Sequence, residues 1–291
     1  DLWQAGLLLA GDKGKCDDDG DPISRPITVG SAMRRIVGRF PAAQLKQDFA
    51  RILSQFRQLG IAVDGGIEVA YHTVCTAMAA YEAELDGEEQ PGVSPWALQV
   101  DFTDGFTRAK RARGFRACQQ LFPSLLKYMH FCYNGTGRLW IVHGGKLVRT
   151  ISNVEGFWQG DAIGGHSFCM AIVDFMDHIR AKFQPHTALD RSVDTLDRGK
   201  ASHAWIIDDL TAMCQDQHVV EVASTIVMDA PRFGLYPNVR KLFAWGPRSN
   251  SESASAKQLQ ALGFQISTGG LQRLLGAPVG RLAWCAQEGG H

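Results

Sequence analysis

Three aspartates are the residues of this 291-residue chain whose types and positions best suit chemistry. Asp101 ends the apolar strand-like run 98–100, and Asp208 and Asp209 follow the apolar run 205–207. An Asp pair at the end of a strand is also a common turn former, so the dipeptide alone decides nothing. Two such strands side by side would bring three carboxylates to one sheet edge, where their repulsion requires cations. Hard divalent ions prefer these oxygens, so the pattern suggests a two-metal phosphoryl-transfer site.

The glycine-rich segment 156–165 (GFWQGDAIGG) is a second feature that suits a binding site. It holds four glycines and Asp161 ahead of a helix that we expect from near Ser167. Glycines let backbone amides come close to a ligand, and a helix N-terminus adds positive potential suited to a phosphate or a paired base. Glycine content alone is a weak signal, so this segment gains meaning only beside the aspartates.

Positive charge is concentrated in one part of a chain whose formal net charge is zero. Residues 96–150 carry nine basic and two acidic side chains. The densest run consists of Arg108, Lys110, Arg111, Arg113 and Arg116. Helical spacing would place these cations on overlapping faces, where they would either line the path of a nucleic acid or form a solvated helix face.

The elements that must position these residues follow from hydrophobic periodicity. Apolar spacing predicts helices at 41–59, 67–80, 167–183 and 219–230, strands at 97–102 and 204–207, and a hairpin at 138–151. Interleaved helices and short strands indicate an α+β or α/β class. The acidic stretch 81–95, which contains Pro and Gly, is typical of a linker or a long loop.

Composition excludes several classes of protein. A hydrophobic content of 45% is enough for a core and excludes disorder as the main state. Seven cysteines form neither a complete disulfide framework nor a zinc-ligand spacing, so we expect a reducing, intracellular location. No apolar run approaches the ~20 residues that cross a bilayer, so no membrane partner is expected. The chain begins at Asp1, and we expect it to be a piece of a longer polyprotein with further domains.

Six motifs in a fixed order carry a resemblance to a known family. They are RPITVGSAMRRIVGRF (25–40), QVDFTDGFTR (99–108), EGFWQGDAIGG (155–165), WIIDDL (205–210), GLYPNVRK (234–241) and GLQRLLGAPVG (270–280). Together they resemble the fingers-and-palm core of reverse transcriptases, above all those of non-LTR retrotransposons. The likeness runs from about Leu7 to Gly280, and the combination and order of the motifs are specific although no single motif is.

The resemblance implies a fold and a division of the chain. The family has a right-hand polymerase fold of the α+β class, with fingers and a palm in which a small antiparallel sheet is backed by helices. The implied segments are fingers at 1–95 and 123–157, palm at 96–122 and 158–268, and a primer-grip region with the start of a thumb at 269–291.

The resemblance also implies roles for residues at the acidic end of the palm. Asp101, Asp208 and Asp209, with the backbone carbonyl of Phe102, match the ligands of two Mg²⁺ or Mn²⁺ ions. Lys241 matches the palm lysine that assists proton delivery to pyrophosphate.

Further matches concern the incoming nucleotide. Phe106 falls where an aromatic ring under the sugar excludes a 2′-hydroxyl, although it could also be a plain core phenylalanine. The other matches are Asp104 and Gly105 beneath the triphosphate, Gln159 and Gly160 against the nucleotide and template, and Lys13 and Arg25 as cations on the triphosphate.

The implied reaction is RNA-directed DNA synthesis, in which a DNA primer 3′-hydroxyl attacks a dNTP on an RNA template. Two other classes stay open. An RNA-dependent RNA polymerase would share the carboxylates but normally carries Gly-Asp-Asp, where this chain has Ile207 before the Asp pair. A catalytically silent nucleic-acid-binding relative, or a decayed retroelement copy, would keep the fold, and Ile206 in place of the family's aromatic residue leaves this open.

Overall fold

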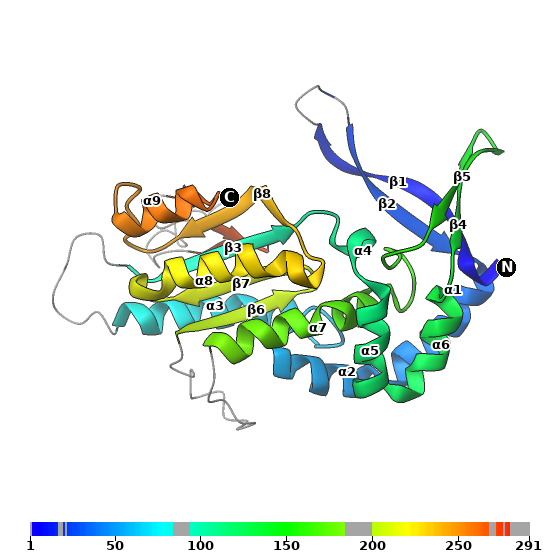
Figure 1. Ribbon diagram of the computed structural model, residues 1–291, viewed down its shortest axis with the longest axis horizontal. Helices are drawn as coiled ribbons and strands as arrows, with labels where there is room; N and C mark the ends of the chain where they lie inside the picture. Colours follow the sequence, from blue (N-terminus) through cyan, green and yellow to red (C-terminus); the bar gives the residue numbers. More distant parts are fainter. Residues whose placement is uncertain are drawn as a thin grey trace. The chain divides into compact units, whose positions relative to one another are not determined.

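The computed structural model describes residues 2–16, 20, 22–83, 94–183, 200–267, 272–275 and 277–279. The chain forms two compact units, each built from two separate stretches of sequence (Figure 1). The first unit comprises residues 1–49 and 104–174, and the second comprises 50–103 and 175–291. Two of the three unit boundaries fall inside helices α2 (Lys46–Leu53) and α7 (Gly164–Phe183), and the third lies between Thr103 and Asp104.

The sheet of the first unit has the strand order β2-β1-β4-β5. Its strands are β1 (Ala5–Cys16), β2 (Pro22–Gly30), β4 (Gly137–His143) and β5 (Lys146–Asn153). β1 and β2 form an antiparallel hairpin, and β4 pairs in parallel with β1. Gly144 and Gly145 close the β4–β5 hairpin with φ of 56° and 75°, because a two-residue turn of this type needs positive φ at both positions. The hairpin predicted at 138–151 is confirmed.

Short helices complete the first unit. They are the 3-10 turn η1 (Leu2–Gln4), α1 (Ala32–Gln44), α4 (Gly105–Arg108), α5 (Arg111–Leu121) and α6 (Pro123–Tyr133). The Ser31 hydroxyl caps α1 by accepting a hydrogen bond from the Arg34 amide at 3.3 Å. Phe49 and Phe122 stack at 4.1 Å between ring centroids and are both buried, so they belong to the core of this unit.

The sheet of the second unit has the strand order β6-β7-β3-β8-β9. Its strands are β3 (Trp96–Phe102), β6 (Ala201–Ile206), β7 (Asp209–Cys214), β8 (Pro237–Trp245) and β9 (Gln265–Ser267). All neighbours are antiparallel except β8 and β9, and β3 is hydrogen-bonded on both sides. The strands predicted at 97–102 and 204–207 are confirmed, the second with its ends shifted toward the N-terminus.

Helices cover both faces of this sheet. The further elements are η2 (Ser54–Phe56), α3 (Gly66–Ala83), α8 (Asp216–Asp229), η3 (Ala230–Phe233), α9 (Ala254–Ala261), β10 (Gln272–Leu274) and β11 (Ala277–Val279). Ala97 packs with Val74 of α3, whereas its neighbour Trp96 donates from its indole to Asp216 at the start of α8, at 2.7 Å. Because successive strand residues face opposite sides, α3 and α8 lie on opposite faces of the sheet (Figure 1).

The helices predicted at 67–80, 167–183 and 219–230 are confirmed, but the helix predicted at 41–59 is wrong in its bounds. In its place α1 begins at Ala32, α2 follows, and η2 ends where Arg57 adopts φ of 59°. Pro41 lies inside α1, where its ring removes one donor from the helix ladder. α3 continues into the stretch expected as a linker, and residues 84–93 of that stretch lie outside the described residues.

Within the described residues the six cysteines form no disulfide, and four of them are buried. Burial raises the pKa of Cys118 to about 12, so this thiol stays protonated at neutral pH. Over the same residues, no helix combines the length and the apolar character needed to cross a membrane.

Candidate active site

Asp101, Asp208 and Asp209 meet at one end of the second unit's sheet because of the strand register. Val100 of β3 pairs with Leu210 of β7, so Asp101, one residue later, comes opposite Asp209, one residue earlier. Asp208 lies in the two-residue turn that joins β6 to β7. The strand that the Asp pair follows, β6, does not lie beside β3 as expected, because β7 comes between them. The Asp pair reaches the same end of the sheet through the turn and the first residue of β7, and the roles of the three carboxylates stay predictions.

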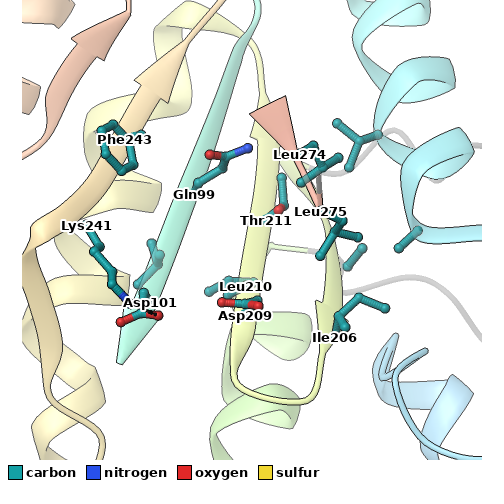
Figure 2. Close-up of a pocket in the computed structure, with 14 residues that line it drawn as sticks. Gln99, Asp101, Ile206, Asp209, Leu210, Thr211, Lys241, Phe243, Leu274 and Leu275 are labelled. Carbon is teal, nitrogen blue, oxygen red and sulfur yellow. Dashed lines mark hydrogen bonds and ion pairs between the residues drawn. The ribbon is translucent and has the colours of Figure 1, made fainter. Parts of the chain in front are cut away.

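Lys241 and Asn238 hold the Asp101 carboxylate. The pairing of β8 with β3 shifts by several residues next to Asp101, and such irregularities re-aim side chains. Lys241 Nζ lies 2.8 Å from Asp101 Oδ1, and Asn238 Nδ2 donates to Oδ2 at 3.3 Å. Figure 2 shows the lysine side chain reaching across from β8 to the carboxylate at the end of β3. The chain itself thus supplies a positive charge to Asp101.

A pocket of about 270 Å³ opens beside Asp101 and Asp209 on the face of the sheet that α3 covers (Figure 2). Its charged end carries these two aspartates and Lys241. Its other walls include Ala70 and Val74 of α3, Gln99 of β3, Thr211 of β7, Phe243 of β8, and Leu274 and Leu275 near β10. The pocket therefore offers charge at one end and apolar contact at the other.

The donor set at this end of the sheet suits a hard divalent cation, because carboxylate oxygens are the ligands such ions prefer. In the part of the chain that the structure describes, however, no three His, Cys, Asp or Glu side chains are gathered closely enough to hold an ion. The residues fit an ion in type and strand position, and an ion at Asp101 would replace the Lys241 ammonium. The Lys241 side chain is 54% exposed, so this exchange costs little, as the exposed pair contributes about 1 kcal/mol or less.

Phe106 and its neighbours belong to the first unit. The Phe106 side chain is buried, and its ring stacks on Phe168 of α7 at 4.5 Å between centroids. Asp104 precedes α4 with φ of 52° and forms an exposed ion pair with Arg108 at 3.6 Å, while Gly105 is buried. A ring with one stacked face suits a core position and also a wall beneath a sugar, so both roles of Phe106 remain open.

Gln159 and Gly160 are fixed against β2. The Thr28 amide donates to the Gln159 carbonyl at 2.8 Å. Gly160 has φ of 103°, and a Cβ at this position would lie 3.0 Å from the Thr28 carbonyl oxygen, so only glycine fits without strain. The backbone of this segment is therefore held in place, and the half-buried Gln159 side chain projects from a fixed support.

A buried ion pair that sequence analysis did not identify holds the same segment. Arg34 Nη2 lies 2.6 Å from Asp161 Oδ2, and neither side chain is more than 1% exposed. The Tyr133 hydroxyl donates to the same oxygen, and the Arg34 guanidinium lies 3.8 Å from the Trp158 ring centroid. Burial raises the pKa of Tyr133, so its hydroxyl stays neutral and remains a donor. Gly30, four residues before Arg34, allows the Arg34 side chain to pack closely and is the sequence signal that could have revealed the pair.

Three further expected binding positions are Arg25, Lys13 and the segment 270–280, and the last two are described only in part. Arg25 is exposed on β2, opposite Gly11 of β1. Lys13 lies in β1, but its side chain falls outside the described residues. Within 270–280, β10 and β11 form an antiparallel hairpin with Leu275 between them, and residues 270, 271, 276 and 280 fall outside the described residues.

The expectation that the cationic run lies along one helix is wrong. α4 ends at Arg108 and α5 begins at Arg111, so the run is interrupted. Arg111 is only 5% exposed, and its guanidinium donates to the carbonyls of Gly156, Tyr133 and Gly135 at 2.9, 3.0 and 2.9 Å. Arg111 is therefore a structural support of the glycine-rich segment and does not face solvent.

The other four cations of the run are at least partly exposed. Arg116 lies on the open face of α5, and Arg113 forms an ion pair with Asp174 at 3.0 Å. Lys110 and Arg108 pair with Glu155 and Asp104 at longer distances. These four side chains could line the path of a nucleic acid or form a solvated surface, because an exposed ion pair is readily exchanged for a phosphate contact.

An antiparallel sheet with three acids at one end, covered by helices and accompanied by a second unit with its own sheet, is the arrangement of a right-hand polymerase. No protein-family model and no curated protein sequence matches the chain. Solved structures with a similar fold are telomerases from two Candida species. The fold class expected from the sequence is confirmed.

The likeness to the telomerases covers most of this chain at low identity. An apo telomerase from Candida tropicalis has a TM-score of 0.57 at 8% identity, covering 95% of this chain and 47% of the telomerase. A form truncated from its C-terminal domain has a TM-score of 0.54 at 10% identity, covering 96% and 53%. Telomerase from Candida albicans in complex with a TWJ fragment of telomeric RNA has a TM-score of 0.55 at 12% identity, covering 84% and 43%. The chain thus spans about half the length of these telomerases.

Proposed function

We propose that this chain is the fingers and palm of an RNA-directed DNA polymerase, the reverse transcriptase of a non-LTR-like retroelement. The observation that carries the proposal is that Asp101, Asp208 and Asp209 lie at the same end of an antiparallel sheet in a polymerase fold. The order of the six sequence motifs favours the retroelement type, while the likeness to telomerases concerns the fold alone.

The reaction follows from what the residues can do. Two Mg²⁺ or Mn²⁺ ions, held by the three aspartates and the Phe102 carbonyl, would lower the pKa of a primer 3′-hydroxyl and neutralise the charge of the departing pyrophosphate. Lys241 carries a proton close to Asp101 and can give it to pyrophosphate. Phe106 closes the space beneath the sugar, and Gln159 presents its side chain to the nucleotide and template.

The proposed partners are an RNA template, a DNA primer and a dNTP. Base pairing with the template supplies sequence selection, so the protein needs phosphate contacts and stacking surfaces more than contacts to base edges. Arg25, the side chain of Lys13 and the partly exposed cations around α5 would supply the phosphate contacts. A telomerase of similar fold has been solved with an RNA fragment, which supports an RNA partner here. An intracellular location and further domains in a longer polyprotein are part of the same proposal.

Primer extension tests the proposal. Asp208→Asn keeps the shape of the side chain but removes a charge that an ion would need, so extension of oligo(dT) on poly(rA) should be abolished while the thermal unfolding midpoint is kept. Asp177→Asn is the matched control, because Asp177 pairs only with Arg180 on α7 among the contacts described. The experiment requires the full-length protein. Extension by Asp208→Asn at the parental rate contradicts the assignment.

A catalytically silent relative is the second candidate, and one observation favours it. Asp101 is paired with Lys241 and Asn238, and over the described residues no three acids are gathered around one point. A silent protein would bind RNA–DNA duplex but neither extend a primer nor gain thermal stability from Mn²⁺. An RNA polymerase would instead incorporate CTP in preference to dCTP, so nucleotide competition separates that class.

A further inference from the structure

The turn that carries Asp208 is conformationally strained. Ile207 and Asp208 form the two-residue connection between β6 and β7, and Ile207 adopts φ of 58°. Positive φ is unfavourable for a β-branched residue, and hairpin turns that require it normally use Gly, Asn or Asp. Such a conformation persists only where surrounding contacts hold it.

The side-chain amide of Gln58 forms hydrogen bonds with both main-chain polar groups of Ile207. The Gln58 Oε1 atom accepts a hydrogen bond from the Ile207 N–H at 2.9 Å, and Nε2 donates to the Ile207 carbonyl at 2.9 Å. The Gly60 amide donates to the same Oε1 at 3.0 Å. The Gln58 side chain is fully buried, so no water competes for these bonds. A single amide group therefore fixes the donor and the acceptor of the strained residue.

The segment around Gln58 is itself docked against β6. The Leu59 amide donates to the Trp205 carbonyl at 2.8 Å, and the Trp205 amide donates to the Arg57 carbonyl at 2.9 Å. A Cβ at Gly60 would lie 2.6 Å from the Ile207 nitrogen, so glycine is required for this approach. Hydrogen bonds and close packing therefore join this segment to the end of β6, directly before the Asp208 turn.

We infer that Gln58 is a positioning residue, which sets the conformation of the Ile207–Asp208 turn and through it the place of the Asp208 carboxylate. This inference rests on the proposed function for its catalytic consequence. Gln58 touches no reacting atom. Without its amide, Ile207 would relax to negative φ and carry the next residue with it. A shift of about 1 Å in a catalytic group can lower a rate by about 10²-fold.

Kinetics of the full-length protein test the catalytic consequence. Gln58→Met keeps the length of the side chain and removes its three hydrogen bonds to the main chain and the one that it donates to Met176 Sδ at 3.9 Å, so kcat should fall about 10²-fold while the KM for dNTP stays within about twofold. Gln4→Met is the matched control, because the Gln4 amide also donates to a main-chain carbonyl, that of Asn134, at 3.0 Å. This control should keep the parental kcat.

A second substitution separates positioning from simple stabilisation. Asn tolerates positive φ, so adding Ile207→Asn to Gln58→Met should restore most of the lost kcat without the amide clamp. If Gln58 only contributed stability, Gln58→Met would lower the unfolding midpoint and leave kcat per folded molecule unchanged. That result overturns the inference, as does a loss of kcat that Ile207→Asn does not restore.

Hydrogen exchange provides a measurement that does not depend on activity. The Ile207 amide should exchange roughly tenfold faster or more in Gln58→Met, with exchange within β6 and β7 unchanged. Unchanged exchange at Ile207 overturns the inference. A parental protein that extends no primer would contradict the proposed function. The exchange measurement would still show whether Gln58 holds the backbone of Ile207. If Gln58→Met does not fold, Gln58→Leu serves instead, because it also forms none of the amide's hydrogen bonds, and the same faster exchange at Ile207 is expected.

Discussion

The two roles that the Phe106 ring could have are separated by Phe106→Ala. If the ring lies beneath the deoxyribose, its removal opens space for a 2′-hydroxyl, so incorporation of CTP relative to dCTP should rise by about tenfold or more. The measurement is the ratio of kcat/KM for the two nucleotides. An unchanged ratio with a lowered unfolding free energy would make Phe106 a core ring that only supports Phe168.

The buried side chain of His203 should make the free energy of unfolding depend on pH. This residue of β6 is fully buried, and burial, with Arg57 and Arg180 nearby, lowers its pKa to about 3, whereas an unfolded histidine has a pKa of about 6.5. Below pH 6.5 the unfolded state therefore binds a proton that the folded state does not. The contribution of neutral His203 to the unfolding free energy is therefore fully present above pH 6.5 and is lost as the pH falls toward 3. Between pH 7.5 and 5 this group should cost about 2 kcal/mol of unfolding free energy.

His203→Leu tests this dependence by removing the titrating group. Urea unfolding at pH 7.5 and 5 should show a smaller pH effect in His203→Leu than in the parental protein, by about 2 kcal/mol. His143→Leu, at the exposed end of β4, is the control for replacing a histidine by leucine. His166, whose pKa burial lowers to about 4, adds a second contribution that remains in both variants. An identical pH effect in His203→Leu and the parental protein would contradict the prediction.

At the scale of single residues, the chemistry of the candidate site could be predicted but its contacts could not. Asp101 and the Asp pair stand out because they end apolar runs, which local sequence reveals. The ion pair between Asp101 and Lys241 depends on an irregular register of β8, which no local pattern encodes. Gln58 escaped prediction for the same reason, because its partner Ile207 is 149 positions away in sequence.

The buried ion pair between α1 and the glycine-rich segment should contribute far more stability than an exposed one. Asp161→Asn leaves the buried Arg34 guanidinium without its counter-charge, which should lower the unfolding free energy by about 3–5 kcal/mol. Asp174→Asn breaks the partly exposed pair with Arg113 and should cost about 1 kcal/mol or less. Urea unfolding of the two variants provides the comparison. Equal losses would mean that the Arg34 pair does not hold the segment.

The cations around α5 should divide into one structural residue and several that face solvent. Replacing the exposed Arg108, Lys110, Arg113 and Arg116 by Gln should lower the slope of log K against log salt for RNA–DNA duplex by roughly 0.7–0.9 for each phosphate that the protein no longer neutralises. Arg111 must be left in place, because its removal leaves the buried carbonyls of Gly156 and Tyr133 without this donor and lowers stability. Fluorescence anisotropy at several salt concentrations measures the slope. An unchanged slope would assign the four cations to a solvated face.

Elements with strong periodicity were predicted well, and elements held by distant contacts were not. α7 and α8 carry continuous apolar stripes, so their existence follows from local spacing. β1 contains three glycines and several charged residues, and it is a strand because β2 and β4 pair with it. α1 contains Gly38 and Pro41, both poor helix formers, and it is stabilised by the buried contacts of Arg34.

For the whole molecule, the fold class could be predicted from the order of motifs, but the division into compact units could not. Two of the three unit boundaries fall inside α2 and α7, where neither composition nor a proline- or glycine-rich linker marks a change, and the third directly follows β3. The division expected into fingers and palm segments is a functional one and stays a prediction. Contacts between distant stretches of the chain define the two units, so the unit boundaries could not be predicted from sequence composition.

The central position of β3 has a consequence for synthesis on the ribosome. β3 leaves the exit tunnel first, while β7 and β8, the strands on either side of it, are translated later. Roughly 100 residues separate its end from the start of β7, which at typical elongation rates means a wait of about 5–20 s. During that interval an apolar strand with both hydrogen-bonding edges open is exposed to other nascent chains. Efficient production of the protein should therefore depend on chaperones that bind extended apolar segments during translation.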